Sequence, residues 1–212
     1  MGNKHPKLSK SDLDYLVEHT SFTDKQIKQW YRGFMKDCPS GELSRGKFLD
    51  IYKALFPDGK AGAFYEHVFR TFDEDGSGKI DFKEFLHAIS VTQAGKPEEK
   101  LELAFRLYDI DRNGCIEEHE MSEIIRAIYL MTDQDTNSLG EDPDSRTRDI
   151  FKKMDTNSDG VLSKQEFIEG CMNDETLFKL LACTGTDTTG ETLDNDTLDV
   201  DEVEDPLDST IE

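Results

Sequence analysis

The sequence predicts an all-α fold of two lobes, each built from a pair of helix–loop–helix hands. Three observations support this prediction. A loop pattern rich in Asp, Asn and Gly recurs along the chain, and apolar residues at helical spacing flank each copy. A Gly- and Pro-containing stretch at 92–97 then separates the repeats into two groups.

Composition restricts the class of protein before any motif is considered. The chain of 212 residues holds 46 acidic and 25 basic residues, a formal net charge of −21, so we expect no nucleic-acid partner. It shows neither an apolar run of about 20 residues nor a secretory signal. The cysteines form no CxxC motif or disulfide framework, and they predict reduced thiols in a cytoplasmic protein: Cys38, Cys115, Cys171 and Cys183.

Three twelve-residue segments carry the repeat: 73–84 (loop 2), 109–120 (loop 3) and 155–166 (loop 4). Each matches the EF-hand calcium loop at positions 1, 3, 5, 6 and 12. An Asp-rich surface turn would explain one such segment, but not three copies. The sequence therefore predicts three EF-hand calcium sites.

The spacing suits the chemistry of calcium, a hard cation that takes six to eight oxygen ligands. Side chains at positions 1, 3 and 5 converge on one point, position 7 offers its carbonyl, and Glu at position 12 supplies two oxygens. Glycine at position 6 permits the sharp turn. We predict Ca²⁺ at these three sites, with Mg²⁺ left open for the resting state. The predicted ligand positions are Asp73, Asp75, Ser77, Lys79, Glu84, Asp109, Asp111, Asn113, Cys115, Glu120, Asp155, Asn157, Asp159, Val161 and Glu166.

A fourth copy, 36–47 (loop 1), has lost the chemistry of the other three. It keeps Gly41 at position 6, but Lys36 and Lys47 replace the carboxylates at positions 1 and 12. Two ammonium groups repel a dication, and Pro39 stiffens the loop at position 4. We expect loop 1 to serve as the structural partner of loop 2.

The four hands predict two EF-hand-pair lobes, residues 1–92 and 98–182, each pair joined by a short antiparallel β ladder at position 8 of its loops. A polar stretch at 131–144 separates hands 3 and 4 without breaking the lobe. Helices are expected at 64–72 and 98–108. Two capping boxes mark further helix starts: Thr23 with Gln26, and Ser163 with Glu166.

The last segment, 183–212, holds eleven acidic residues and no basic one. It lacks the apolar surface needed to offset the entropy of ordering, so we predict a disordered acidic tail. An acidic partner-binding segment is the alternative.

Apolar side chains are unusually frequent in the first two hands. Opening of an EF-hand pair exposes such residues as a groove for an amphipathic helix, although plain core packing explains them equally well. The candidate groove residues are Trp30, Phe34, Phe48, Ile51, Tyr52, Phe56, Phe82 and Phe85.

Several motifs together resemble the neuronal calcium sensor family, the group of visinin-like proteins, hippocalcin, neurocalcin and recoverin. They are MGNK at the start, FT at 22–23, WYRGF at 30–34, DCPSGEL at 37–43 and FRTFDEDGSGKIDFKEF at 69–85. The Cys-Pro pair in loop 1 is a hallmark of that family. The resemblance covers residues 1–182.

The resemblance implies calcium at loops 2–4, a target groove in the N-terminal lobe and a myristoyl group on Gly2. Lys4, Lys7 and Lys10 would then add attraction to an anionic membrane surface. Pro6 departs from the acylation motif, which takes Ser or Thr there, and the alternative is an ordinary N-terminus. A homodimer is left open.

The leading functional hypothesis is a non-enzymatic calcium sensor, cytoplasmic and attached to the membrane periphery in a calcium-dependent way. In relatives, calcium extrudes the lipid and opens the groove to a target helix. A non-switching calcium buffer and a constitutive regulatory subunit are the alternatives. No HExxH motif, phosphate-binding Gly loop or nucleophile elbow supports an enzyme. Cys38 corresponds to an oxidation site in relatives, and the preferred alternative is a partly buried, inert thiol.

Overall fold

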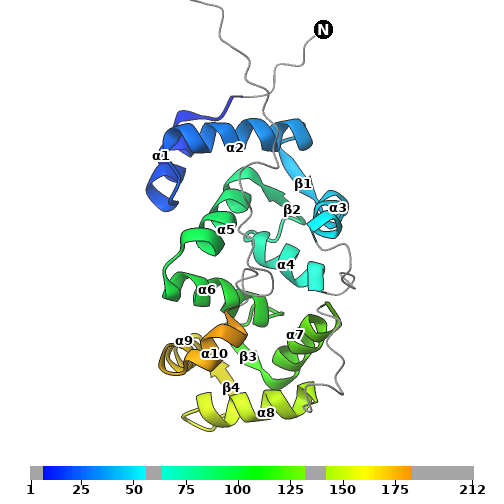
Figure 1. The fold of residues 1–212 in the computed structure, drawn as a ribbon, viewed down its shortest axis with the longest axis vertical. Helices are drawn as coiled ribbons and strands as arrows, with labels where there is room; N and C mark the ends of the chain where they lie inside the picture. The colour runs from blue at the N-terminus through cyan, green and yellow to red at the C-terminus, as the bar shows by residue number, and fades with distance from the viewer. Residues whose placement is uncertain (1–6, 56–63, 132–141, 183–212) are drawn as a thin grey trace, which may run out of the picture.

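The computed structural model describes residues 7–55, 64–131 and 142–182, which form two helical lobes stacked along the long axis of the molecule (Figure 1). The N-lobe comprises α1 (Lys10–His19), α2 (Asp24–Asp37), β1 (Glu42–Ser44), α3 (Arg45–Leu55), α4 (Phe64–Phe72), β2 (Lys79–Asp81) and α5 (Phe82–Ala94). The C-lobe comprises α6 (Pro97–Tyr108), β3 (Cys115–Glu117), α7 (Glu118–Met131), α8 (Pro143–Met154), β4 (Val161–Ser163), α9 (Lys164–Asn173) and α10 (Glu175–Leu181). The all-α prediction is confirmed.

Helix starts follow the local signals in the sequence. Thr23 caps α2, with its N–H donating to Gln26 Oε1 at 2.9 Å, and Ser163 caps α9 in the same reciprocal way. Both predicted capping boxes are therefore present. The helix expected at 98–108 begins one residue earlier, because Pro97 is suited to the first turn, where its missing N–H costs nothing.

Each lobe contains one antiparallel pair of three-residue strands. Leu43 lies opposite Ile80 in the N-lobe, and Ile116 lies opposite Leu162 in the C-lobe. All four side chains are almost completely buried. The predicted position-8 ladders are confirmed, and hand 1 pairs with hand 2 although its loop lacks the ligands.

Aromatic rings pack the core of both lobes. Phe48 meets Phe69 edge to face at 5.5 Å between ring centroids, and Phe105 meets Phe167 at 5.9 Å. Phe69 and Phe167 are fully buried. These contacts join the entering helix of one hand to an exit helix of its partner, so that the two hands of a lobe share one core.

The lobes are joined by a shorter connection than the 92–97 break suggests. Helix α5 continues to Ala94, and only Gly95 and Lys96 lie before α6. A side chain at Gly95 would place its Cβ 2.4 Å from the Val91 carbonyl oxygen, which explains the glycine. At this tight joint α5 packs on α6, and α4 packs on α6 and α7.

The connection between α1 and α2 is attached to α5. The Ser21 N–H donates to the Ser90 hydroxyl at 2.8 Å, and the two hydroxyl oxygens are 3.1 Å apart. Within the described residues no helix is both long and apolar enough to cross a bilayer. The predictions for Gly2, Lys4, Phe56, the 132–141 part of the polar stretch and the 183–212 tail lie outside the described residues.

Candidate calcium centres

Loops 2, 3 and 4 share one pattern of internal hydrogen bonds. The position-1 aspartate accepts the N–H of the position-6 glycine in each loop, at distances of 2.9, 3.1 and 3.0 Å. The position-3 side chain accepts the position-5 N–H, and the position-5 side chain accepts the position-7 N–H. The polar side chains that would hold a cation are thus turned inward by the loop backbone itself.

The position-12 glutamate is held at both ends of its loop. In all three loops one carboxylate oxygen accepts the N–H of position 2 and the other accepts the N–H of position 9, at distances between 2.8 and 3.2 Å. Glu84 and Glu166 are also the third residues of capping boxes that begin α5 and α9. The start of the exit helix therefore positions the ligand.

Carboxylates converge most closely in loops 2 and 3. Asp73, Asp75 and Glu84 bring one oxygen each within 4.8 Å of one another, and the corresponding residues of loop 3 do the same. Asp73 is 4% exposed and Glu120 only 2%. Asp75 and Asp111 are exposed, but holding like charges this close to a buried carboxylate is unfavourable without a cation between them. The donor set is entirely oxygen, so it fits Ca²⁺.

Two pKa shifts agree with this picture, whereas hydrogen bonds from Ser77 lower the pKa of Asp75. Burial raises the pKa of Glu84 and that of Asp109 above their ordinary values. A group kept from water resists ionisation until a positive charge compensates it. A calcium ion in either loop would supply that charge.

Loop 4 keeps the same order of ligands in a looser arrangement. Among the described residues, its carboxylates do not form a cluster of the kind seen in loops 2 and 3. Hydrogen bonds from the Ser163 hydroxyl and N–H lower the pKa of Glu166 to about 2. Asn157 at position 3 also removes one charge. The Glu166 carboxylate is ionised and already bonded by the helix cap.

The backbone shows a requirement that the sequence analysis missed. Position 4 is left-handed in all three intact loops, with φ of 70° at Gly76, 61° at Arg112 and 60° at Ser158. Proline fixes φ near −65°, so Pro39 cannot adopt this conformation. Loop 1 is therefore excluded from the calcium geometry by its backbone as well as by its two lysines.

Cys38 occupies position 3 of loop 1, where the intact loops carry Asp or Asn. Its side chain is buried, and burial raises the pKa of the thiol. A buried thiol that resists ionisation is a poor nucleophile. The structure favours the inert alternative.

The predicted groove residues lie in two aromatic groups of the N-lobe. On α2 and α5, Trp30 lies 6.0 Å from Phe85, and Phe34 lies 5.4 Å from both Phe82 and Phe85. Phe34 and Phe82 are buried, whereas Trp30 and Phe85 are half-buried.

The second group lies on α3 and α4. Phe48 packs between Tyr52, Phe69 and Phe72, and both Phe48 and Tyr52 are buried. Ile51 points the other way and is 38% exposed. Four of the predicted groove residues thus belong to the core in this conformation.

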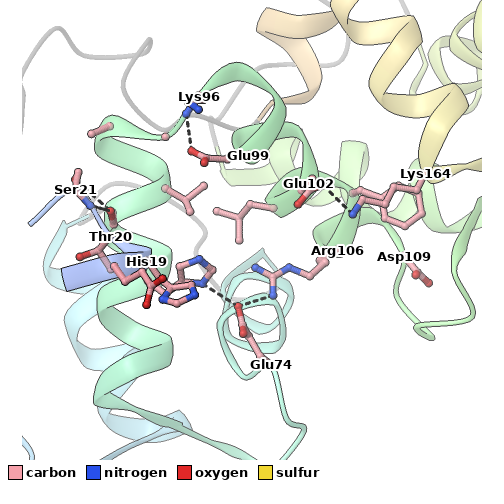
Figure 2. Close-up of a pocket in the computed structure, with 18 residues that line it drawn as sticks. His19, Thr20, Ser21, Glu74, Lys96, Glu99, Glu102, Arg106, Asp109 and Lys164 are labelled. Carbon is pink, nitrogen blue, oxygen red and sulfur yellow. Dashed lines mark hydrogen bonds and ion pairs between the residues drawn. The ribbon is translucent and has the colours of Figure 1, made fainter. Parts of the chain in front are cut away.

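A cavity of about 840 Å³ opens beside loop 2, between the two lobes (Figure 2). At its edge Glu74, position 2 of loop 2, accepts hydrogen bonds from His87 on α5 and Arg106 on α6. The His87 hydrogen bond and the Arg106 pairing together lower the pKa of Glu74 to about 2. An ionised carboxylate therefore links the calcium loop of one lobe to the entering helix of the other.

Comparison with known proteins identifies the family to which these loops and helices belong. The EF hand domain model matches residues 64–92, and the EF-hand domain pair model matches residues 98–172. Recoverin of Homo sapiens is 41% identical over 186 residues, which cover 85% of this chain and 93% of the relative. The chain belongs to the neuronal calcium sensor family.

Two further relatives agree. S-modulin of Aquarana catesbeiana is 41% identical over 186 residues, covering 85% of this chain and 92% of the relative. Neuronal calcium sensor 1 of Lymnaea stagnalis is 44% identical over 183 residues, covering 85% and 96%. Family membership confirms the resemblance in the sequence motifs, and with the acidic loop clusters it supports the role of a calcium sensor.

Proposed function

We propose that this neuronal calcium sensor binds three calcium ions, in loops 2, 3 and 4, and transmits their binding to a partner through the N-lobe. The observation that carries the proposal is the hydrogen-bond pattern shared by these three loops, in which the side chains at positions 1, 3, 5 and 12 accept backbone N–H groups of their own loop. Loop 1 carries lysines at positions 1 and 12 and proline at position 4, and it remains a structural element.

A short route connects loop 2 to the N-lobe aromatics. Glu84 is the last ligand of loop 2 and lies in the first turn of α5. The next residue, Phe85, contacts Trp30 and Phe34 on α2. When calcium draws the Glu84 carboxylate toward positions 1 and 3, Phe85 moves with the backbone, and its contacts on α2 must rearrange.

The partner we propose is an amphipathic helix that takes up the aromatic side chains released by this rearrangement. The N-terminal segment supplies the second attachment: a myristoyl group on Gly2, with Lys4, Lys7 and Lys10 against anionic lipid. One myristoyl chain binds membranes only marginally, and each nearby lysine adds about 1 kcal/mol. Calcium would release the lipid, as it does in relatives, and these two weak contributions would then attach the chain to the cytoplasmic face of a membrane.

The test is a calcium titration of the N-myristoylated chain that follows Trp30 emission and sedimentation with vesicles containing phosphatidylserine. Trp30 is the only tryptophan of the chain and contacts Phe85, so its emission reports on hand 2. Calorimetry of the same sample gives the number of ions bound. The expected result is three ions, a cooperative change in emission and sedimentation that requires calcium.

Variants separate the parts of the proposal. Glu84→Gln should remove one ion and most of the emission change, whereas Lys47→Gln, the matched change at position 12 of loop 1, should alter neither. The Gly2→Ala chain should bind calcium normally and stay in solution. Stoichiometric calcium uptake with no change in emission or sedimentation would contradict the sensor proposal and indicate a buffer.

A further inference from the structure

Two arginines connect loops 2 and 3 across the lobe junction, each belonging to one hand and bonded to the other. Arg70, in the last turn of α4, donates to the carbonyl of Leu107 at 2.7 Å and to that of Asp109 at 3.2 Å. Arg112, at position 4 of loop 3, donates to the carbonyls of Arg70 at 2.7 Å, Glu74 at 3.3 Å and also Asp73. We call Arg70 and Arg112 the junction arginines.

The acceptors are the carbonyls with which a calcium loop begins. Helices α4 and α6 end at Phe72 and Tyr108, and the bonded carbonyls lie in the last turn of these helices or at positions 1 and 2 of the loops that follow. A cation at a helix C-terminus compensates carbonyls that have no partner within the helix. Each junction arginine therefore stabilises the geometry of the other hand's first loop residues, including the aspartate at position 1.

The backbone of Arg112 sets the direction of its side chain. Position 4 is left-handed in every intact loop, and at Arg112 the φ is 61°. This conformation is uncommon for a residue with a side chain, and calcium coordination by positions 3 and 5 would hold position 4 between them. An ordered loop 3 thus places the Arg112 guanidinium on loop 2.

Arg70 is costly to bury, which argues that the junction serves more than stability. It is half-buried, and its Nε lacks a hydrogen-bond partner among the described residues. A buried unpaired donor is unfavourable, and an apolar side chain could fill the same place without that cost. Only a group with several N–H donors can hold the Leu107 and Asp109 carbonyls at once.

We propose that the junction arginines couple the two calcium sites, so that an ion in loop 3 raises the calcium affinity of loop 2, and the reverse. The inference rests on the proposed function, because it needs calcium at both loops. Coupling free energies between sites correspond to changes in affinity of roughly 5- to 150-fold. We expect about tenfold here, toward the lower end, because Arg112 is exposed to solvent.

The experiment is a double-mutant cycle on the full chain. Arg112→Gly removes the guanidinium but permits the left-handed backbone, as Gly76 does at the same position of loop 2. Glu120→Gln disables loop 3 at position 12. The calcium affinity of loop 2 is measured by Trp30 emission and calorimetry in the parent chain, in both single variants and in the double variant.

Loss of loop 3 should weaken loop 2 about tenfold in the parent chain and less than twofold in the Arg112→Gly background. Linkage requires the reciprocal result, so Glu84→Gln should weaken loop 3 by the same factor. Hydrogen exchange at the Gly78 amide, which donates to Asp73, gives a second readout: it should slow when loop 3 fills, but not in Arg112→Gly. Ser158→Gly is the matched control at position 4 of loop 4 and should leave loop 2 unchanged.

An equal loss of loop-2 affinity in both backgrounds would mean that the coupling does not pass through Arg112, and no loss in the parent chain would mean that the sites are not coupled. Either result overturns this proposal and leaves the proposed function intact. If Glu84→Gln, made in the parent chain, changes neither the number of ions bound nor the Trp30 emission, both the coupling and the proposed function are overturned. Arg106→Gln distinguishes the junction arginines from an ordinary pair across the junction. Among the described residues, the Arg106 side chain bonds only the Glu74 side chain and none of the carbonyls with which the loops begin, so the coupling should persist in that variant.

Discussion

Loops 1 and 2 are partners in one lobe, and they differ in chemistry far more than in architecture. Both place a glycine at position 6 in the left-handed region, with φ of 83° at Gly41 and 80° at Gly78. Both pair through their strands, and both are followed by a phenylalanine at the start of the exit helix. Only loop 2 brings three carboxylates together.

The difference shows that the scaffold of an EF-hand can persist after its metal chemistry is lost. What loop 1 retains are the features that join it to loop 2: the strand, the buried Leu43 and the core aromatics. What it lacks are the charges at positions 1 and 12 and the left-handed backbone at position 4. Each set of features can be changed without the other, and the following experiments do so.

The largest effect is expected from breaking what the two loops share. Leu43 is 1% exposed and lies opposite the fully buried Ile80. Leu43→Ala should cost about 3 kcal/mol of unfolding free energy, as removal of a buried leucine side chain usually does. Urea unfolding of the calcium-free chain measures it, with the exposed Leu130→Ala as control. A loss below about 1 kcal/mol would show that the strand pair does not hold hand 1 in place.

The next effect tests what the loops do not share. Glu84→Gln removes a charged ligand from loop 2, and calcium affinity at that site should fall at least ~100-fold, about 2.7 kcal/mol. Calorimetry should then count one ion fewer. Lys47→Gln, at the same position of loop 1, is expected to leave the count unchanged; a lower count in that variant would mean that loop 1 takes part in binding.

Restoring the ligands of loop 1 in two steps separates the effect of its missing charges from the effect of its backbone conformation. Lys36→Asp, Cys38→Asp and Lys47→Glu together restore the acidic ligands, but Pro39 still excludes the left-handed conformation, so we expect no new site. Adding Pro39→Gly should create one with a Kd of about 10⁻⁴ M, which stabilises the chain by about 1.4 kcal/mol at 1 mM calcium. Equal calcium binding by the triple and quadruple variants would contradict the role of position 4.

Glycine at position 6 offers a matched pair of smaller changes. A Cβ at Gly41 or Gly78 would meet no atom within 4 Å, so alanine at either position adds only backbone strain. Each substitution should cost about 1 kcal/mol of unfolding free energy without calcium. With calcium, Gly78→Ala should show the greater loss. Similar losses at the two positions under both conditions would mean that the ion does not depend on this turn.

The smallest effect concerns the neighbouring helices against which each hand packs. Hand 1 packs on α1, whereas α4 of hand 2 packs on the C-lobe, where His67 Nε2 lies 3.6 Å from Glu123 Oε1. Burial, and then the nearby Arg70, lower the pKa of His67. The unfolded chain therefore binds a proton more readily, and stability present above the unfolded value of 6.5 is lost as the pH falls below it.

The Tm of the parent chain should fall between pH 7.5 and 5.5. The fall should be smaller in His67→Gln than in the parent chain. The exposed His119→Gln provides the control, since its side chain is 72% accessible. An identical pH profile in the parent chain and in His67→Gln would show that the α4–α7 contact tolerates the protonated ring.

Local patterns in the sequence predict most of this fold. The 64–72 helix, both strand pairs and the capping boxes of Thr23 and Ser163 follow from signals only a few residues apart. A third box, Asp81 with Glu84, carries the same spacing and was missed. The left-handed position 4 was also missed, although Gly76 in loop 2 and Pro39 in loop 1 both point to it.

Features that depend on packing between distant segments could not be predicted in this way. Nothing in the local sequence distinguishes the exposed Ile51 from the buried Tyr52, because burial depends on what the lobe places against each side. The bonds of Arg70 and Arg112 join residues about forty positions apart. They exist only because the two-residue joint at Gly95 folds one lobe against the other.

The attachment of Ser21 to Ser90 gives α5 a mechanical role. The helix is fixed to loop 2 near its start through Glu84, and Ser90 lies about 9 Å further along, so a swing of roughly 10° would carry that serine about 1.6 Å sideways. The 2.8 Å bond to Ser21 cannot absorb such a displacement. A rotation of α5 on calcium binding, as proposed for loop 2, would therefore pull on the connection between α1 and α2, at the other end of the N-lobe.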